Sequence, residues 1–174
     1  MGFFDFLKGK KAEEWFEVYS PLNGKVIPLS EVPDEAFAQK MIGDGCAIDP
    51  APGAIYAPVD GEIDIFETNH AVSLEAPNGI EMIVHFGIDT VKLNSEGLKR
   101  VADVGSAKKG DKLIEYDLDY IRENAKSTKT PIIITSMDMV DTIEVVASGD
   151  VKVGDLLMRV KLKNAKQRKE ENNK

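Results

Sequence analysis

The sequence predicts an all-β fold, a compact antiparallel β-sandwich or flattened barrel with short helical segments. From about residue 18 to residue 162 the chain is a series of short apolar or alternating runs separated by turn residues. Asp-Gly and Asn-Gly dipeptides, which favour tight hairpins, stand at 60–61 and 78–79. Only two short segments have the pattern of a helix. Many short strands with few helices are typical of a sandwich or barrel.

In chain order, the expected strands and their turns fall in seven runs: 18–29, 54–66, 71–88, 110–118, 131–137, 142–148 and 154–162. A helix is expected within 31–42, where Pro33 is followed by good helix formers, and a second within 118–127. The runs at 110–118 and 154–162 both begin with Gly-Asp before an apolar strand. This similarity hints at an internal duplication.

Composition indicates one ordinary globular domain with some tail. The chain has 174 residues, of which 43% are hydrophobic and 30% charged, and its net charge is −8. A negative charge without a basic stripe argues against nucleic-acid binding. The single cysteine, Cys46, excludes an intrachain disulfide and suits a reducing cytoplasm. Because its neighbours are small and apolar, we interpret it as a core residue.

The chain divides into an amphipathic N-terminal tail (1–17), a domain (18–162) and a charged, disordered C-terminal tail (163–174). Within "MGFFDFLKGKK", Phe3, Phe4 and Leu7 share one helical face and three lysines follow. This pattern predicts contact of residues 1–11 with an anionic membrane surface. The alternative is that these apolar side chains pack on the domain. No apolar stretch approaches the roughly 20 residues that a membrane-spanning helix needs.

The chain has two histidines, and one of them, His85, lies in "GIEMIVHFGI", residues 79–88. In a strand the even-numbered residues from Ile80 to Ile88 share one face, which is wholly apolar. His85 therefore lies on the other face, between Ile83 and Gly87. The glycine leaves room beside the imidazole ring.

The other histidine, His70, opens an alternating set with Val72 and Leu74. Thr68 lies two residues before it, on the same side of an extended chain. Its hydroxyl could bond one imidazole nitrogen and so select the tautomer of His70.

Three uses of such histidines remain open from the residues alone. They can be satisfied structural residues, or two ligands of a zinc ion with Glu67, Glu81 or Asp89 as the third. They can also act as nucleophile and stabiliser in group transfer. The chain has no His-x-His, His-Glu-x-x-His or Cys-x-x-Cys, no Gly-x-Ser-x-Gly and no Walker loop. A dedicated metalloenzyme, a serine hydrolase and a nucleotide-binding enzyme are therefore disfavoured.

Five segments together resemble a known family. They are "EVPDEAFAQKMIGDG", "APVDGEI", "FETNHA", "VHFGIDTVKL" and "AKSTKTPIIITSMD". In this order they resemble the glucose-type enzyme IIA of the bacterial sugar phosphotransferase system, over residues 18 to 160. The resemblance implies a compact antiparallel β-sandwich with a shallow apolar depression around the two rings.

By this resemblance, His85 accepts a phosphoryl group on Nε2 from phospho-HPr. It then passes the group to a cysteine of a sugar-specific enzyme IIB. His70 stabilises the moving group, and Thr68 orients His70. The resemblance also implies that four residues flank the site and contact partners: Asp34, Phe37, Phe66 and Asp89.

No cofactor is implied for the transfer, although His70 and His85 together with a partner carboxylate suit zinc. We expect a cytoplasmic protein that residues 1–11 can hold at the inner face of the membrane. Regulated transporters or metabolic enzymes are further expected partners. The rival hypothesis is a purely regulatory binding module that uses the same depression without relaying phosphate. A lipoyl or biotin carrier would need a lysine between the methionines of Met137-Asp138-Met139, which is absent.

Overall fold

The computed structural model describes residues 15–164 and 166–167 and confirms the predicted all-β fold. Its strands are β1 (Trp15–Tyr19), β2 (Gly24–Ile27), β3 (Asp44–Pro50), β4 (Gly53–Tyr56), β5 (Gly61–Ile65), β6 (Ala71–Glu75), β7 (Glu81–His85), β8 (Leu98–Arg100), β9 (Gly105–Ala107), β10 (Lys112–Tyr116), β11 (Thr130–Ile134), β12 (Val140–Val145), β13 (Asp150–Val151) and β14 (Leu156–Leu162). Short helices are α2 (Glu35–Ala38) and α3 (Leu118–Asn124), with 3-10 turns η1 (Leu29–Glu31), η2 (Thr90–Leu93) and η3 (Met137–Met139).

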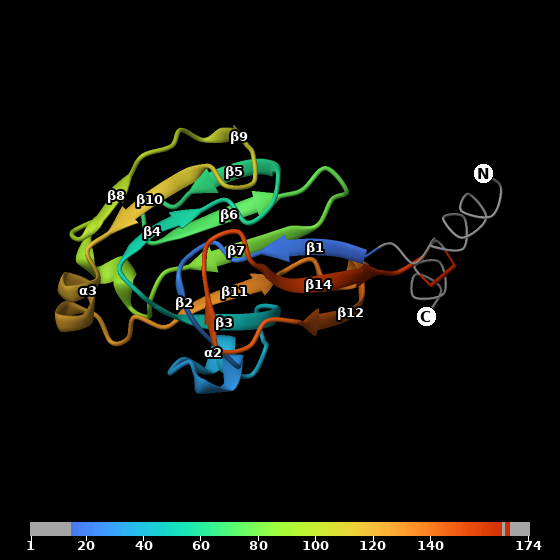
Figure 1. Cartoon of the computed structure of the whole chain (residues 1–174), viewed down its shortest axis with the longest axis horizontal. Helices are drawn as coiled ribbons and strands as arrows, with labels where there is room; N and C mark the ends of the chain where they lie inside the picture. Colours follow the sequence, from blue (N-terminus) through green and yellow to red (C-terminus); the bar gives the residue numbers. More distant parts are fainter. Residues whose placement is uncertain (1–14, 165, 168–174) are drawn as a thin grey trace.

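The strands form one large and two small sheets that together make a sandwich (Figure 1). The large sheet has eight strands in the order β13-β2-β3-β11-β7-β6-β5-β9. The small sheets have the orders β1-β14-β12 and β4-β10-β8. Each named strand pair is antiparallel, which matches the short connections that the turn residues predict.

The two Gly-Asp turns occupy equivalent places, which supports the hint of duplication. The turn before β10 is closed by Lys108 N, which donates to the Asp111 carboxylate at 2.9 Å. The turn before β14 is closed by Lys152 N, which donates to the Asp155 carboxylate at 2.8 Å. The strands that follow also pair alike, since β10 pairs with β4 as β14 pairs with β1. In the large sheet β9 pairs with β5 as β13 pairs with β2.

The two dipeptides predicted to form hairpins behave differently. Asn78-Gly79 closes the β6–β7 hairpin, in which Glu75 is opposite Glu81, as expected. The hairpin predicted at Asp60-Gly61 is wrong, because β4 pairs with β10 whereas β5 pairs with β6 and β9. At Asp60 the chain crosses between sheets. The Asp60 carboxylate there accepts a hydrogen bond from Lys109 N at 2.7 Å instead of closing a hairpin.

One central strand, β3, is absent from the predicted runs. Its sequence "DGCAIDP" has the composition of a turn, yet it lies between β2 and β11. Gly45 is required there, because a Cβ at this position would lie 2.2 Å from the Ile132 carbonyl oxygen. Cys46 is buried as predicted, and burial raises the pKa of its thiol to about 12. The thiol is therefore protonated at neutral pH and unsuited to chemistry.

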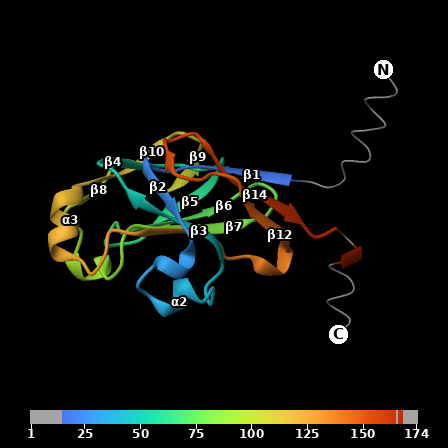
Figure 2. The same ribbon diagram turned by 60° about the horizontal axis from the view of Figure 1, so that its bottom comes forward.

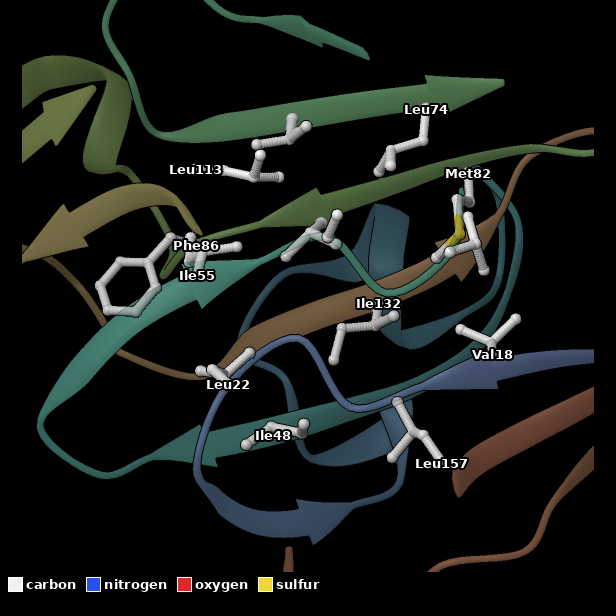
Figure 3. Close-up of a cluster of buried hydrophobic side chains, with 14 of the residues drawn as sticks. Val18, Leu22, Ile48, Ile55, Leu74, Met82, Phe86, Leu113, Ile132 and Leu157 are labelled. Carbon is white, nitrogen blue, oxygen red and sulfur yellow. The ribbon is translucent and has the colours of Figure 1, made fainter. Parts of the chain in front are cut away.

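The main core fills the space between the large sheet and the small sheets. Figure 3 shows Ile48, Ile132 and Met82 of the large sheet in one cluster with Ile55, Leu113 and Leu157 of the small ones. Met82, Val84 and Phe86 of the "GIEMIVHFGI" segment belong to this core, as their alternation predicts. Burial of such a cluster supplies most of the free energy that stabilises the fold.

A second, smaller cluster lies on the outer face of the large sheet. It joins Ile83, Ala47 and Ile133 of the sheet to Leu29 of η1 and Phe37 of α2. Figure 2 shows α2 projecting from β3 and β7 on the side away from β4 and β10. Ile88, predicted to share the core face, lies in this second cluster instead, because the chain turns at Gly87 (φ +68) and alternation ends there.

The first strand begins inside the range 1–17 that the sequence assigned to the N-terminal tail. Strand β1 begins at Trp15 and β14 ends at Leu162, and Asn164 and Gln167 exchange two hydrogen bonds of 2.8 Å. The predicted membrane contact of residues 1–11 lies outside the described residues. Within residues 15–164 and 166–167, every helix is too short to span a bilayer.

Candidate functional site: a pair of imidazoles

Strand pairing brings the two histidines together. His85 ends β7 and is opposite Ala71, the first residue of β6. His70 immediately precedes β6, and its carbonyl accepts a hydrogen bond from Phe86 N at 2.7 Å. The imidazole ring centroids are 4.8 Å apart and the planes are inclined by 79°. The two rings therefore form one site, as the resemblance implied.

His85 lies on the outer face of the large sheet, as its alternation predicts. Its Nδ1 is 2.9 Å from the carbonyl oxygen of Gly87. A carbonyl oxygen can only accept, so Nδ1 must carry the proton. In a neutral ring the lone pair is then on Nε2, which is the nitrogen left for attack.

His70 is placed by a turn and not by a strand. The prediction that it shares a face with Val72 and Leu74 is wrong, since those two side chains lie in the main core. Residues 67–70 form a turn, with Asn69 at φ +60, so the alternation of β6 begins only after His70. Thr68 Oγ1 is 2.6 Å from His70 Nδ1, which is the contact predicted for it.

Two phenylalanines extend the pair into a row of four rings. The Phe37 ring centroid is 5.0 Å from that of His85, and the Phe66 centroid is 5.4 Å from that of His70. Phe37 is buried in the second cluster, whereas Phe66 is 38% exposed. Both residues named from the resemblance thus border the imidazoles, and Phe66 presents an apolar surface to solvent.

Burial keeps both imidazoles neutral. It lowers the pKa of His70 from 6.5 to about 4, and the neighbouring His85 acts in the same direction. Burial also lowers the pKa of His85, against the opposing effects of the Gly87 hydrogen bond and the charge of Asp34. At neutral pH the pair therefore presents lone pairs and N–H donors without a positive charge.

The two predicted acids differ in position. Asp34 caps α2 and accepts hydrogen bonds from the backbone nitrogens of Ala36 and Phe37, at 2.9 and 3.3 Å. Its negative charge partly opposes the lowering of the His85 pKa by burial. Asp89 is exposed in a left-handed conformation (φ 63), and its carboxylate is 3.8 Å from Lys92 Nζ. Asp34 thus borders the rings from α2, and Asp89 is available at the surface after β7.

Sequence reasoning missed the groups that hold the Gly87 turn. The hydroxyl of Thr130 in β11 accepts a hydrogen bond from Gly87 N at 3.3 Å. The hydroxyl of Thr90 donates to the Phe86 carbonyl at 2.6 Å. Thr90 lies within "VHFGIDT" and could have been suspected as a local cap, but Thr130 is 43 residues from Gly87 and carries no local signal.

The pair supplies only part of a metal shell. Among residues 15–164 and 166–167 no third His, Cys, Asp or Glu joins His70 and His85 to form a metal-binding group. Zinc prefers four ligands, so two imidazoles fit a zinc ion only if other ligands come from outside the described chain.

An antiparallel sandwich that presents one neutral imidazole with a free Nε2, beside a second imidazole, has the chemistry of a histidine-based phosphoryl carrier. Comparison with known proteins agrees. Residues 16–140 match the model of the family described as "phosphoenolpyruvate-dependent sugar phosphotransferase system, EIIA 1".

Relatives with assigned names support the same family. The glucose-specific EIIA component of Haemophilus influenzae is 48% identical over 159 residues, covering 89% of this chain and 95% of that protein. The component of the same name from Borreliella burgdorferi is 48% identical over 146 residues, covering 83% and 76%. The solved structure of glucose permease IIA from Mycoplasma capricolum has a TM-score of 0.79 at 36% identity, covering 84% and 96%.

The chain therefore belongs to the EIIA 1 family of the phosphoenolpyruvate-dependent sugar phosphotransferase system. It is a phosphotransferase component that carries phosphoryl groups during sugar uptake. These comparisons favour the carrier over the purely regulatory module that the sequence had left as the rival hypothesis.

Proposed function

We propose that His85 is the phosphoryl acceptor, with phospho-HPr as donor and a cysteine of an enzyme IIB as the next acceptor. The lone pair of His85 Nε2 attacks phosphorus, the phosphorus–nitrogen bond to HPr breaks, and a new phosphorus–nitrogen bond forms on His85. The proton stays on His85 Nδ1 throughout and is donated to the Gly87 carbonyl. In the second transfer the thiolate of enzyme IIB attacks phosphorus and His85 leaves with its electron pair.

His70 stabilises the phosphoryl oxygens in both transfers. For this purpose the Thr68 hydroxyl donates to His70 Nδ1, at 2.6 Å, and the His70 proton is then on Nε2. A neutral donor fixed beside the moving anion lowers the free energy of the transition state without reorganising. The lowered pKa of His70 supports this role, since a charged ring would hold the phosphoryl group and slow its release.

The partners dock on the apolar surface around the rings. Phe66 is exposed at one end of the row, Asp34 acts on His85 with its negative charge, and Asp89 is exposed after β7. This combination suits partners that present an apolar patch with arginine beside it. The relatives named glucose-specific support glucose as the proposed sugar of the pathway. The proposed place of the relay is the cytoplasm.

The single observation that carries the proposal is the His85 Nδ1 bond to Gly87, which leaves Nε2 free. Mass spectrometry after incubation with phosphoenolpyruvate, enzyme I and HPr tests it. Wild type should gain one phosphate and His85→Gln none, while His70→Gln, the matched control in the adjacent ring, still gains one. Phosphate on a folded His85→Gln protein would refute the assignment.

We also propose that zinc binds weakly to His70 and His85 alone and firmly when a partner supplies a carboxylate. Two imidazoles leave a tetrahedral ion two ligands short. Phosphorylation should oppose binding, because it occupies the Nε2 lone pair of His85. Calorimetry of zinc with the full chain is the test, with His70→Gln as the one-ligand control. Nanomolar affinity of the isolated chain would mean that the internal site is complete and would contradict the proposal.

A further inference from the structure

Two buried hydroxyls beside the site have no part in the proposed transfer. Thr90 and Thr130 are each fully buried, with 0% of their surface exposed. Both hydrogen-bond to the backbone around Gly87, one from η2 and the other from β11. The question is what this turn gains from two threonines brought from different elements.

They hold the peptide unit between Phe86 and Gly87 at both ends. Its carbonyl, on Phe86, accepts from the Thr90 hydroxyl at 2.6 Å. Its N–H, on Gly87, donates to the Thr130 hydroxyl oxygen at 3.3 Å. Thr130 donates its own proton to the Thr128 carbonyl at 2.9 Å, so a lone pair is left for Gly87. This peptide cannot rotate without breaking a buried hydrogen bond.

The next peptide unit, between Gly87 and Ile88, contains the carbonyl that bonds His85. Its carbonyl accepts from His85 Nδ1 at 2.9 Å, and its N–H donates to the Ser127 carbonyl at 2.8 Å. The two peptides share the Cα atom of Gly87. The orientation of the first peptide therefore helps to set the position of the second, together with the hydrogen bond from Ile88 N to Ser127.

Glycine makes external support necessary. At φ +68 a Cβ on residue 87 would lie 2.7 Å from the Ser127 carbonyl oxygen and 2.7 Å from Thr90 Cγ2, so only glycine fits. Glycine, however, populates many backbone conformations and does not by itself keep this one. The two hydroxyls supply the restraint that the residue lacks.

We propose that Thr130 and Thr90 are positioning residues for phosphoryl transfer, which keep the Gly87 carbonyl directed at His85 Nδ1 and so keep the lone pair on Nε2. Without that carbonyl a neutral imidazole carries its proton on either nitrogen. The tautomer with a proton on Nε2 has no lone pair at the attacking atom and cannot accept the group. This inference rests on the proposed function, in which His85 is the acceptor.

The test uses the full chain and compares Thr130→Val with Thr130→Ser. Valine keeps the shape of threonine without its oxygen, whereas serine keeps the oxygen. Nitrogen NMR of ¹⁵N-histidine-labelled, unphosphorylated protein reports the tautomer of His85. Single-turnover mixing with phospho-HPr reports the rate of acceptance. Ile132→Val, a fully buried change on the same strand, is the control for loss of stability.

We expect wild type and Thr130→Ser to show one His85 tautomer, protonated on Nδ1. Thr130→Val should show a mixture of the two His85 tautomers. It should accept phosphate about tenfold more slowly, because the reacting group is mispositioned. Ile132→Val should match wild type in both readings. Thr90→Val and Thr90→Ser should repeat the pattern of the Thr130 pair.

A folded Thr130→Val protein with the wild-type tautomer and rate would overturn the inference, as would equal slowing by Ile132→Val. If Thr130→Val fails to fold, Thr130→Ala removes the same oxygen and is read in the same way. The NMR reading does not depend on phosphate transfer. Failure of the proposed function would appear separately, as wild-type protein that carries its phosphate on a residue other than His85.

Discussion

At the scale of single residues, the proposed transfer depends on two hydrogen bonds that orient two identical rings differently. The Gly87 carbonyl can only accept, so it puts the proton of His85 on Nδ1 and leaves Nε2 as a nucleophile. The Thr68 hydroxyl can donate, which allows His70 to keep its proton on Nε2. Neighbouring residues in the chain, each two positions from its histidine, thus distinguish the proposed acceptor from the proposed stabiliser.

Stability should fall with acid more steeply in wild type than in His70→Gln. Unfolded His70, with a pKa near 6.5, takes up a proton below that pH, whereas folded His70, with a pKa of about 4, does not. The unfolded state then binds more protons, so the free energy of unfolding decreases as pH falls from 6.5 toward 4. Between pH 7 and pH 5 the shift corresponds to about 2 kcal/mol.

Urea unfolding at the two pH values measures this difference. The comparison between wild type and His70→Gln cancels the carboxylates, which titrate in both proteins. His85→Gln is a useful companion, because burial lowers the pKa of that ring too. An equal dependence on pH in wild type and His70→Gln would show that His70 is not held neutral by the fold.

At the scale of elements, the chain places its site where regular structure ends. His85 is the last residue of β7 and His70 the residue before β6, so both rings stand at one end of the β6–β7 hairpin. The turn after β7 contains two departures from strand geometry, Gly87 and Asp89, both with positive φ. Alternation along β7 places His85 on the outer face of the large sheet. The turn at Gly87 ends this alternation and places Ile88 in the second cluster on the same face.

Gly87→Ala should therefore damage both fold and function, and Gly149→Ala is its matched control. The two glycines have nearly equal φ, +68 and +69, but a Cβ at Gly149 meets nothing within 4 Å. The left-handed backbone alone should cost about 1 kcal/mol in each variant. The clashes with Ser127 and Thr90 should raise the loss at Gly87 to about 3 kcal/mol or more.

Denaturant unfolding and phosphate uptake from phospho-HPr are the two measurements for this pair of variants. Gly149→Ala should take up phosphate at the wild-type rate, because its turn precedes β13, an edge strand that β2, β3 and β11 separate from β7. Equal losses of stability in the two variants would show that the turn at Gly87 accommodates a side chain, and that the close approach there is not required.

At the scale of the whole molecule, two chemically different regions lie in one chain. The domain carries the pair of imidazole rings, whereas the sequence of residues 1–11 has Phe3, Phe4 and Phe6 followed by Lys8, Lys10 and Lys11. A negatively charged protein, with a net charge of −8, does not approach an anionic membrane without such a basic segment. This segment would concentrate the carrier near membrane-embedded sugar permeases.

Deleting residues 1–11 should weaken co-sedimentation with vesicles that contain anionic lipid and leave phosphorylation in solution unchanged. The attraction has an electrostatic part, so wild-type binding should also fall as salt is raised. Deleting residues 168–174, a charged segment of the opposite terminus without apolar side chains, is the control and should have no effect. Binding that is unaffected by the N-terminal deletion would exclude the membrane role.

The sequence by itself determined the all-β class, the β6–β7 hairpin and the outward position of His85, because these follow from local alternation and turn chemistry. Tertiary structure alone decided the rest. Strand β3 pairs although its composition is that of a turn, since Gly45 allows β11 to approach closely. Asp60-Gly61 joins two sheets where its dipeptide predicts a hairpin, and Thr130 reaches Gly87 from 43 residues away. Such contacts depend on which strands become neighbours, and no local pattern encodes that choice.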